Sequence, residues 1–156
     1  MKTSSGIYRR SLPIALLASV AAFPLILGSC AVHENKRDLA PGYSSSKIAS
    51  LKSFYVRKDE QDDDNLGQDI ADELNGRGFR ASAGTTSRPP SKVDAIITYN
   101  DKWVWDVTMY MLSLDLQLRE PASDAVSATA KTTRTSLIRK SQKEMVRETV
   151  SKLIEN

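Results

Sequence analysis

An apolar stretch at residues 12–28 does most to limit what this chain folds into. It follows a start that carries three basic residues, Lys2, Arg9 and Arg10. A basic segment, an apolar segment and small residues, in that order, are typical of a secretory signal that the mature protein lacks. A single membrane-spanning helix is the alternative, since about 20 apolar residues cross a bilayer, but Pro13 and Pro24 interrupt this stretch. We therefore expect residues 1–29 to be a signal peptide outside the folded domain.

The apolar stretch ends at residues 27–30 in Leu-Gly-Ser-Cys, which resembles the lipobox of bacterial lipoproteins. In that motif an aliphatic residue and two small residues precede a cysteine whose thiolate takes a diacylglycerol group. The resemblance implies cleavage before Cys30, a thioether-linked lipid, and a further acyl chain such as palmitate on the new amino terminus. Each buried methylene contributes about 0.8 kcal/mol, so two or three chains hold a protein on its membrane. Cys30 is thus the expected lipidation site.

The residue after the cysteine bears on which membrane is reached. In the lipoprotein sorting rule, Asp at this position tends to retain the protein at the inner membrane, and this chain has Ala31. The resemblance therefore implies the periplasmic side of the outer membrane, with the inner membrane as the alternative.

The charge balance argues against a nucleic-acid partner. Three of the 22 lysines and arginines precede Cys30 and none of the 19 acidic residues do, which leaves 19 of each in the mature chain. A neutral chain lacks the diffuse basic surface that nucleic-acid binders carry. We expect no nucleic-acid partner.

Reactive side chains are scarce, because Cys30 is the only cysteine and His33 the only histidine. Lipidation consumes the thiol, and His33 lies three residues from the expected anchor. A catalytic histidine has to be held rigidly beside its nucleophile, so His33 is interpreted as a solvated linker residue. We expect no cofactor and no enzymatic nucleophile.

The mature chain divides into a tether and one domain. Residues 30–46 are polar and rich in turn residues, without an apolar period, and this composition is typical of a flexible tether. Residues 47–156 have the usual size of a single domain.

Two segments of this domain have a helical period. One has a capping-box pattern at Asn65 and Gln68, followed by apolar residues spaced by four at Leu66, Ile70 and Leu74. The other has a capping-box pattern at Ser141 and Glu144. It continues with an apolar stripe at Met145, Val146, Thr149, Val150, Leu153 and Ile154.

Strand patterns occupy residues 48–56, 79–83, 93–99, 109–118 and 125–132. In the fourth, leucines at every second position alternate with polar residues, which indicates a sheet with one wet face. Residues 100–102 indicate a turn or bulge. The order β-α-β-β-β-β-α predicts an α+β fold, with a four- or five-stranded, mostly antiparallel sheet and two helices packed on one face.

A family resemblance rests on several of these features together. They are the lipobox, the tether, the strand-helix start, the segment Asp-Lys-Trp-Val-Trp-Asp at residues 101–106 before a long alternating strand, and the final amphipathic helix. This arrangement resembles a group of small Gram-negative lipoproteins, whose fold is similar to the α/β unit of the TolB amino-terminal domain and the curli-secretion lipoprotein. The resemblance implies residence in the cell envelope and a protein partner, and it carries over no catalytic residue.

Aromatic residues gather between two predicted strands, at Tyr99, Trp103, Trp105 and Tyr110. Trp and Tyr dominate the energetic centres of protein interfaces, and an extended segment places Trp103 and Trp105 on one face. The same residue types also cap the end of a small core. The candidate partner-binding residues are Trp103, Trp105, Asp101 and Asp106, with a core role for the two tryptophans as the alternative.

Two charged clusters have ordinary structural explanations. The acidic run at residues 59–64 fits a calcium loop at Gly67 and Glu73, but Leu66 occupies a position where an oxygen ligand is required. Acidic charge before a helix amino terminus, which stabilises by about 0.3–1 kcal/mol per group, is favoured, and we expect no metal site. A solvated basic edge, rather than a site for an anionic partner, is favoured for Lys131, Arg134, Arg139, Lys140 and Lys143.

The leading hypothesis is a non-enzymatic, membrane-anchored periplasmic lipoprotein that binds or scaffolds another envelope component, with an envelope protein as partner. The alternative is an envelope hydrolase acting on peptidoglycan or lipid, with Asp101 and Asp106 as acid and base. A lipid carrier is the third class, but it requires an apolar cavity that a small domain with two helices is not expected to enclose.

Overall fold

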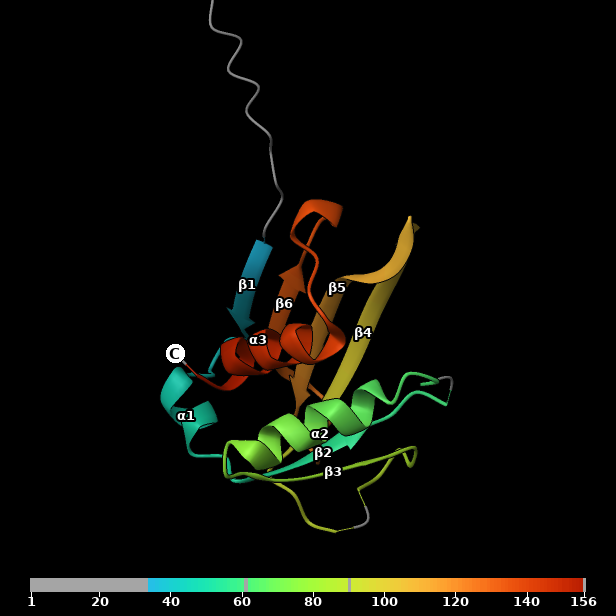
Figure 1. Cartoon of the computed structure of the whole chain (residues 1–156). Coiled ribbons are helices and arrows are strands. Elements are labelled where there is room, and N and C mark those ends of the chain that lie inside the picture. The colour runs from blue at the N-terminus through green and yellow to red at the C-terminus, as the bar shows by residue number, and fades with distance from the viewer. Residues whose placement is uncertain (1–33, 61, 90, 156) are drawn as a thin grey trace, which may run out of the picture.

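The computed structural model describes residues 34–60, 62–89 and 91–155, which form a single sheet with helices across one face (Figure 1). The sheet has six strands in the order β1-β6-β5-β4-β2-β3. The predicted signal peptide, Cys30 and His33 lie outside the described residues. The α+β fold with two main helices on one face is confirmed, and the sheet is larger than the predicted four or five strands.

The sheet is antiparallel in one part and parallel in the other. The antiparallel neighbours are β1 (Glu34–Leu39), β6 (Val126–Thr133), β5 (Thr108–Arg119) and β4 (Ala95–Asp106). The parallel part adds β2 (Ser53–Arg57) and β3 (Arg80–Gly84), which are joined through α2 (Leu66–Gly76). Parallel strands need such a crossover connection, whereas antiparallel strands are joined by short turns.

The core lies between the sheet and the two long helices. Leu114, Leu116 and Leu118 of β5 are almost fully buried, whereas the polar residues between them are only half-buried on the opposite face. Helix α3 (Gln142–Ile154) buries the stripe predicted from its sequence. It begins at the predicted capping box, because Ser141 and Glu144 each accept a hydrogen bond from the other's backbone. None of the described helices is long and apolar enough to cross a membrane.

The tether predicted over residues 30–46 is wrong for residues 34–39, which form the edge strand β1. Every residue of β1 pairs with β6, from Glu34 opposite Thr133 to Leu39 opposite Ala128. This strand is held mainly through its backbone, since none of its residues is buried. An edge strand of this kind needs no apolar alternation, so its sequence resembles that of a linker.

The first predicted strand begins five residues too early. A short helix, α1 (Ser45–Ala49), precedes it, and the strand itself starts at Ser53. Ser44 caps α1 by accepting a hydrogen bond from the backbone N–H of Lys47, and Ile48 is the residue that α1 buries. A single apolar residue in a short helix does not produce a helical period, which explains the error.

Strands β4 and β5 form a long hairpin that extends past the two long helices, α2 and α3 (Figure 1). The pairing register shifts between Lys102 and Trp103, where Leu112 of β5 is left without a partner residue. The predicted irregularity at residues 100–102 is therefore a bulge, and the chain turns only at Val107, which has a φ of 63°. Bulges of this type bend the strand pair and increase its twist.

Candidate functional site at the end of the hairpin

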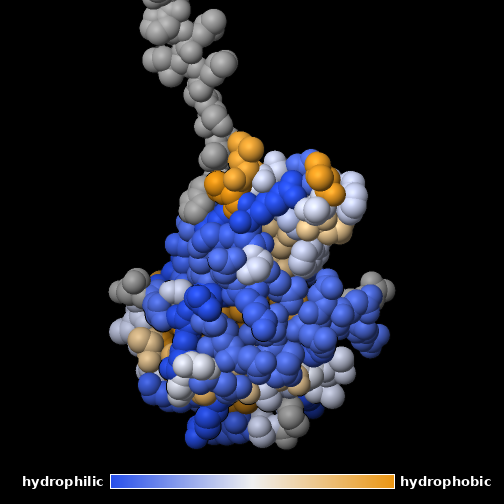
Figure 2. Space-filling view, viewed as in Figure 1, coloured by the Kyte–Doolittle hydropathy of each residue, from blue (hydrophilic) through white to orange (hydrophobic). Residues whose placement is uncertain are grey.

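Exposed apolar side chains gather at the end of the molecule formed by the β4–β5 hairpin and the short helix η1 (Ser136–Ile138). The exposed fractions are 72% for Trp105, 82% for Val107, 55% for Met109 and 77% for Leu137. We call these four residues the apolar tip. Figure 2 shows apolar surface at this end as two patches separated by polar atoms. Large exposed apolar side chains that gather at one end, with polar atoms around them, are typical of a contact site.

The two tryptophans differ in their surroundings. Trp103 stands opposite Met111 and packs, half-buried, against the hydrophobic core. Trp105 lies two residues further along the same strand, opposite Met109, and is largely exposed. Both face the same side of β4, because β4 continues without interruption past the bulge. Of the two candidate tryptophans, Trp103 supports the core and Trp105 is available for contact.

The two candidate carboxylates are not brought together. Asp101 and Asp106 are both exposed and lie on opposite faces of the same strand, since their separation is an odd number of residues. Along an extended strand they are roughly 17 Å apart. Paired catalytic carboxylates lie within about 10 Å of each other. The geometry therefore gives no support to these two residues as an acid and base pair.

Asp106 is instead part of a clamp around Arg139, which the sequence prediction placed on a solvated basic edge. Nη2 of Arg139 donates to the backbone oxygen of Asp106 at 2.7 Å and to its Oδ2 at 3.1 Å. Nη1 donates to Oγ1 of Thr108 at 2.6 Å. The guanidinium carbon lies 4.5 Å from the centre of the Tyr110 ring. This one side chain connects the segment after β6 to both strands of the hairpin end.

A second member of the predicted basic edge is buried. The side chain of Arg134 is 1% exposed, and its guanidinium forms an ion pair with Glu148 of α3, which also pairs with Lys140. Arg134 further donates to the backbone oxygen of Thr133 at 2.8 Å and to Oδ1 of Asn35 at 3.3 Å. The solvated-edge prediction is wrong for Arg134, because this arginine fills the layer between sheet and helix.

The open face of the sheet carries Asp115, a carboxylate with an altered pKa. Burial raises the pKa of Asp115, and the positive charge of Lys131, 4.0 Å away, opposes this effect only partly. Lys131 of β6 is thus the cross-strand partner of Asp115 of β5. This pair is the ordinary opposite-charge contact of an antiparallel sheet.

The acidic run before α2 supplies hydrogen-bond acceptors to the first backbone N–H groups of the helix. The carboxylate of Asp62 accepts hydrogen bonds from the backbone N–H of Leu66 at 2.8 Å and of Gly67 at 3.0 Å. Asn65, the predicted cap, has a left-handed backbone and makes no side-chain capping bond, so the predicted capping box is wrong there. Among the described residues, no group of three or more His, Cys, Asp or Glu side chains is placed to hold a metal ion.

The surroundings of Asp62 are tightly packed. Burial acts to raise its pKa, but hydrogen bonds from the Gly67 backbone and the Tyr99 hydroxyl, with others, outweigh that effect and lower it. Lys58 adds an ion pair at 3.5 Å. Burial, and then the hydrogen bond and charge of Asp62, raise the pKa of Tyr99. Tyr99 therefore belongs to this helix start and is separate from the apolar tip.

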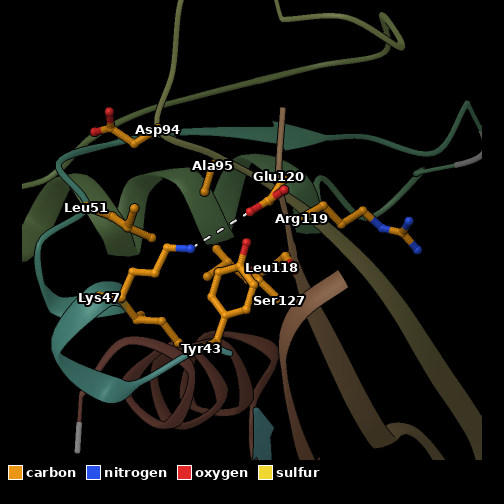
Figure 3. Close-up of a pocket in the computed structure, with 10 residues that line it drawn as sticks. Tyr43, Lys47, Leu51, Asp94, Ala95, Leu118, Arg119, Glu120 and Ser127 are labelled. Carbon is orange, nitrogen blue, oxygen red and sulfur yellow. Dashed lines mark hydrogen bonds and ion pairs between the residues drawn. The ribbon is translucent and has the colours of Figure 1, made fainter. Parts of the chain in front are cut away.

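A small cavity lies at the opposite end of the sheet, between α1 and the start of β4 (Figure 3). Its volume is about 60 Å³. Lys47 reaches across its mouth, 3.9 Å from Glu120 and 3.8 Å from the centre of the Tyr43 ring. Sites for small organic ligands enclose about 300–1,000 Å³, so this cavity has room for little more than water.

No protein-family model matches the sequence, and no curated protein matches it. Solved structures of PelC share the fold. The PelC dodecamer from Paraburkholderia phytofirmans is 13% identical, with a TM-score of 0.57 over 80% of this chain and 99% of that chain. A variant of that dodecamer has the same identity and coverage, with a TM-score of 0.53. A PDZ domain protein from Parabacteroides distasonis gives a TM-score of 0.45 at 10% identity, over 72% of this chain and 32% of that chain. At these identities the similarity to PelC shows that the two chains have a common fold.

Proposed function

We propose that this protein is a lipid-anchored, periplasmic component of the cell envelope that acts by binding and not by catalysis. The observation that carries this proposal is the apolar tip, where four large side chains are exposed at one end of a small domain. Exposing them costs free energy unless another surface covers them. The domain is therefore expected to work in contact with another envelope component.

The anchor in this proposal is Cys30, and its support is the Leu-Gly-Ser-Cys sequence at the end of the apolar stretch. The outer membrane is the proposed location, because Ala31 follows the cysteine. Growth with a radioactive fatty acid tests the anchor. Label is expected in the wild-type protein and absent from Cys30→Ser, and equal labelling of the two would refute it.

A non-enzymatic role is supported by the geometry of the candidate groups. Asp101 and Asp106 lie on opposite faces of β4, roughly 17 Å apart, so they do not form an acid and base pair. Hydrolysis of purified peptidoglycan or phospholipid by the pure protein would overturn this part of the proposal.

Crosslinking in intact cells tests the binding role. A photoreactive amino acid at Val107 is expected to capture an envelope component, because its side chain is 82% exposed at the apolar tip. The same amino acid at Leu39, at the far end of β1, is the matched control and is expected to capture little. Equal yields from the two positions would show that the tip is not a specific contact site.

Self-assembly is a second candidate role, favoured by the PelC neighbour, which is a dodecamer. We also propose that the fold is similar to the TolB amino-terminal and curli-secretion units. That similarity would favour a different envelope protein as the partner, and not a second copy of this chain. Light scattering of the lipid-bearing protein in detergent separates the two. A discrete oligomer supports self-assembly, whereas a monomer at all concentrations excludes it.

A further inference from the structure

We infer that the apolar tip contacts the lipid surface of the membrane that holds Cys30, so that the domain touches the bilayer at the hairpin end as well as through its anchor. This inference rests on the proposed lipidation of Cys30 and names the partner of the proposed binding site. It follows from the position of β1 in the sheet, the length of chain before β1, and the chemistry of the tip.

The first step is the position of the chain entry. Glu34, the first residue of β1, pairs with Thr133, which pairs with Ser113, which pairs with Lys102. These residues form one row across four strands, so Glu34 and Lys102 are about 14 Å apart. The chain therefore enters the domain at the same end of the sheet as the apolar tip (Figure 1).

The second step is the reach of the chain. Cys30 precedes Glu34 by four residues, which span at most about 14 Å. From Lys102 the hairpin continues for four more residues to Asp106, or about 13 Å along the strand. Both lengths start from the same row of the sheet. If Cys30 carries a lipid, the membrane surface therefore lies no further from this row than about the length of the hairpin end. The edge strand β1 leaves too little chain for the domain to stand away from the bilayer.

The third step is chemistry. Trp105 is an aromatic residue of the type enriched at membrane–water interfaces, where one end of the ring is apolar and the other hydrated. Val107, Met109 and Leu137 are apolar and more than half exposed. Val107 occupies the turn itself, so it is the first side chain to meet a surface that approaches along the hairpin.

The charged residues nearest the apolar tip offset one another. The exposed carboxylate of Asp106 is paired with Arg139, which offsets its charge. The exposed Lys102 lies at the base of the hairpin end. The contact is therefore expected to depend mainly on apolar side chains and only weakly on anionic lipid.

A protein surface fits the tip less well. Stable protein interfaces have one well-packed apolar core surrounded by a polar rim, whereas the four large apolar side chains of the tip form two separate patches. A small apolar set adds to the membrane binding of a covalent lipid, because binding strength scales with the apolar area that is buried.

The test uses lipid-bearing protein purified from its own membranes and placed in vesicles of phosphatidylethanolamine and phosphatidylglycerol with brominated acyl chains, which quench nearby tryptophan fluorescence. The two tryptophans are separated by substitution. Trp103→Phe leaves Trp105 as the reporter, and Trp105→Phe leaves Trp103. Strong quenching is expected in the first variant and little in the second. In the Trp103→Phe background, Val107→Asp is expected to reduce the quenching severalfold, and Leu39→Ser, the matched control, to leave it unchanged.

The outcomes separate the tip from the anchor. A thermal melt by circular dichroism confirms that each variant is folded, and the mass of the amino-terminal peptide reports the lipid on Cys30. Lipid on Cys30 without quenching of Trp105 overturns the inference and leaves the proposed anchor standing. A bare Cys30 overturns both. A Trp105 spectrum that shifts to shorter wavelength with protein concentration, but is not quenched by brominated lipid, assigns the tip to a second copy of the chain and also overturns the inference.

Discussion

Arg139 donates two hydrogen bonds to Asp106 at the end of the hairpin, one to the backbone oxygen at 2.7 Å and one to the carboxylate at 3.1 Å. The same guanidinium lies over the ring of Tyr110. A two-stranded ribbon on its own is only marginally stable in water. The clamp therefore explains how a hairpin that extends beyond α2 and α3 keeps a defined shape.

Replacing Arg139 with alanine is expected to loosen the hairpin end without unfolding the domain. The hydrogen bonds to Asp106 and Thr108 would be lost, and hydrogen exchange of the amides at residues 104–110 should accelerate roughly tenfold, since bonds to a charged group contribute about 1.5–3 kcal/mol. Arg139→Lys should rescue only in part, because lysine lacks the planar fork. Unchanged exchange in Arg139→Ala would show that the clamp does not support the hairpin.

Removing the partner of Arg134 is expected to be strongly destabilising. Glu148→Ala leaves a buried guanidinium without its carboxylate, which costs about 3–5 kcal/mol of unfolding free energy. The double variant Arg134→Met with Glu148→Ala should recover much of this loss, because no buried charge remains. Urea denaturation of the single and double variants measures both values. A double variant less stable than Glu148→Ala would contradict the explanation.

Two glycines of α2 allow a controlled comparison of the effect of adding a side chain. A Cβ at Gly67 would lie 2.6 Å from Cγ of Lys58 and 2.9 Å from the hydroxyl of Tyr99, whereas a Cβ at Gly76 would meet nothing within 4 Å. Gly67→Ala is expected to lower the unfolding free energy by about 1–3 kcal/mol through overpacking. Gly76→Ala should raise it by about 0.4–1 kcal/mol. Thermal denaturation of both variants checks the sign of each change, and a stabilising Gly67→Ala would refute the close packing.

Asp62 is expected to make the domain sensitive to acid. Its pKa is lower in the folded chain than the ordinary value of 3.8, so its contribution to stability is complete above that pH and is lost as the pH falls through the folded value. Asp62→Ala should cost about 1–2 kcal/mol at neutral pH, as expected for a lost helix cap. The difference between wild type and variant in urea denaturation should shrink below about pH 4. A difference that is constant down to pH 2 would contradict the assignment.

The sequence predicts those elements whose side chains are buried on one face. Leu114, Leu116 and Leu118 alternate because helices cover one side of β5, and the stripe of α3 is apolar for the same reason. Elements that are held mainly by backbone hydrogen bonds cannot be predicted from the pattern of apolar residues. Strand β1 has no buried residue, and the turn at Val107 requires a left-handed φ that valine rarely adopts.

The candidate site was predictable in part. The cluster at residues 103–106 is recognisable as unusual from its aromatic and acidic residues, but sequence spacing cannot distinguish the packed Trp103 from the exposed Trp105. That difference depends on where the helices stop covering the hairpin. The sequence does not predict that Leu137 and Arg139 lie at this end, because they belong to a segment more than 25 residues away in the chain.

Strand β1 also determines how the domain bears mechanical load. Its first residue, Glu34, follows the proposed anchor by four residues in the sequence, and all six residues of β1 pair with β6. A force applied to the anchor along the strand axis would load all these backbone pairs in shear at the same time. A force applied at Glu34 perpendicular to the strand would break them one after another. The domain is therefore built to resist being pulled straight away from a bilayer far better than being peeled from its side.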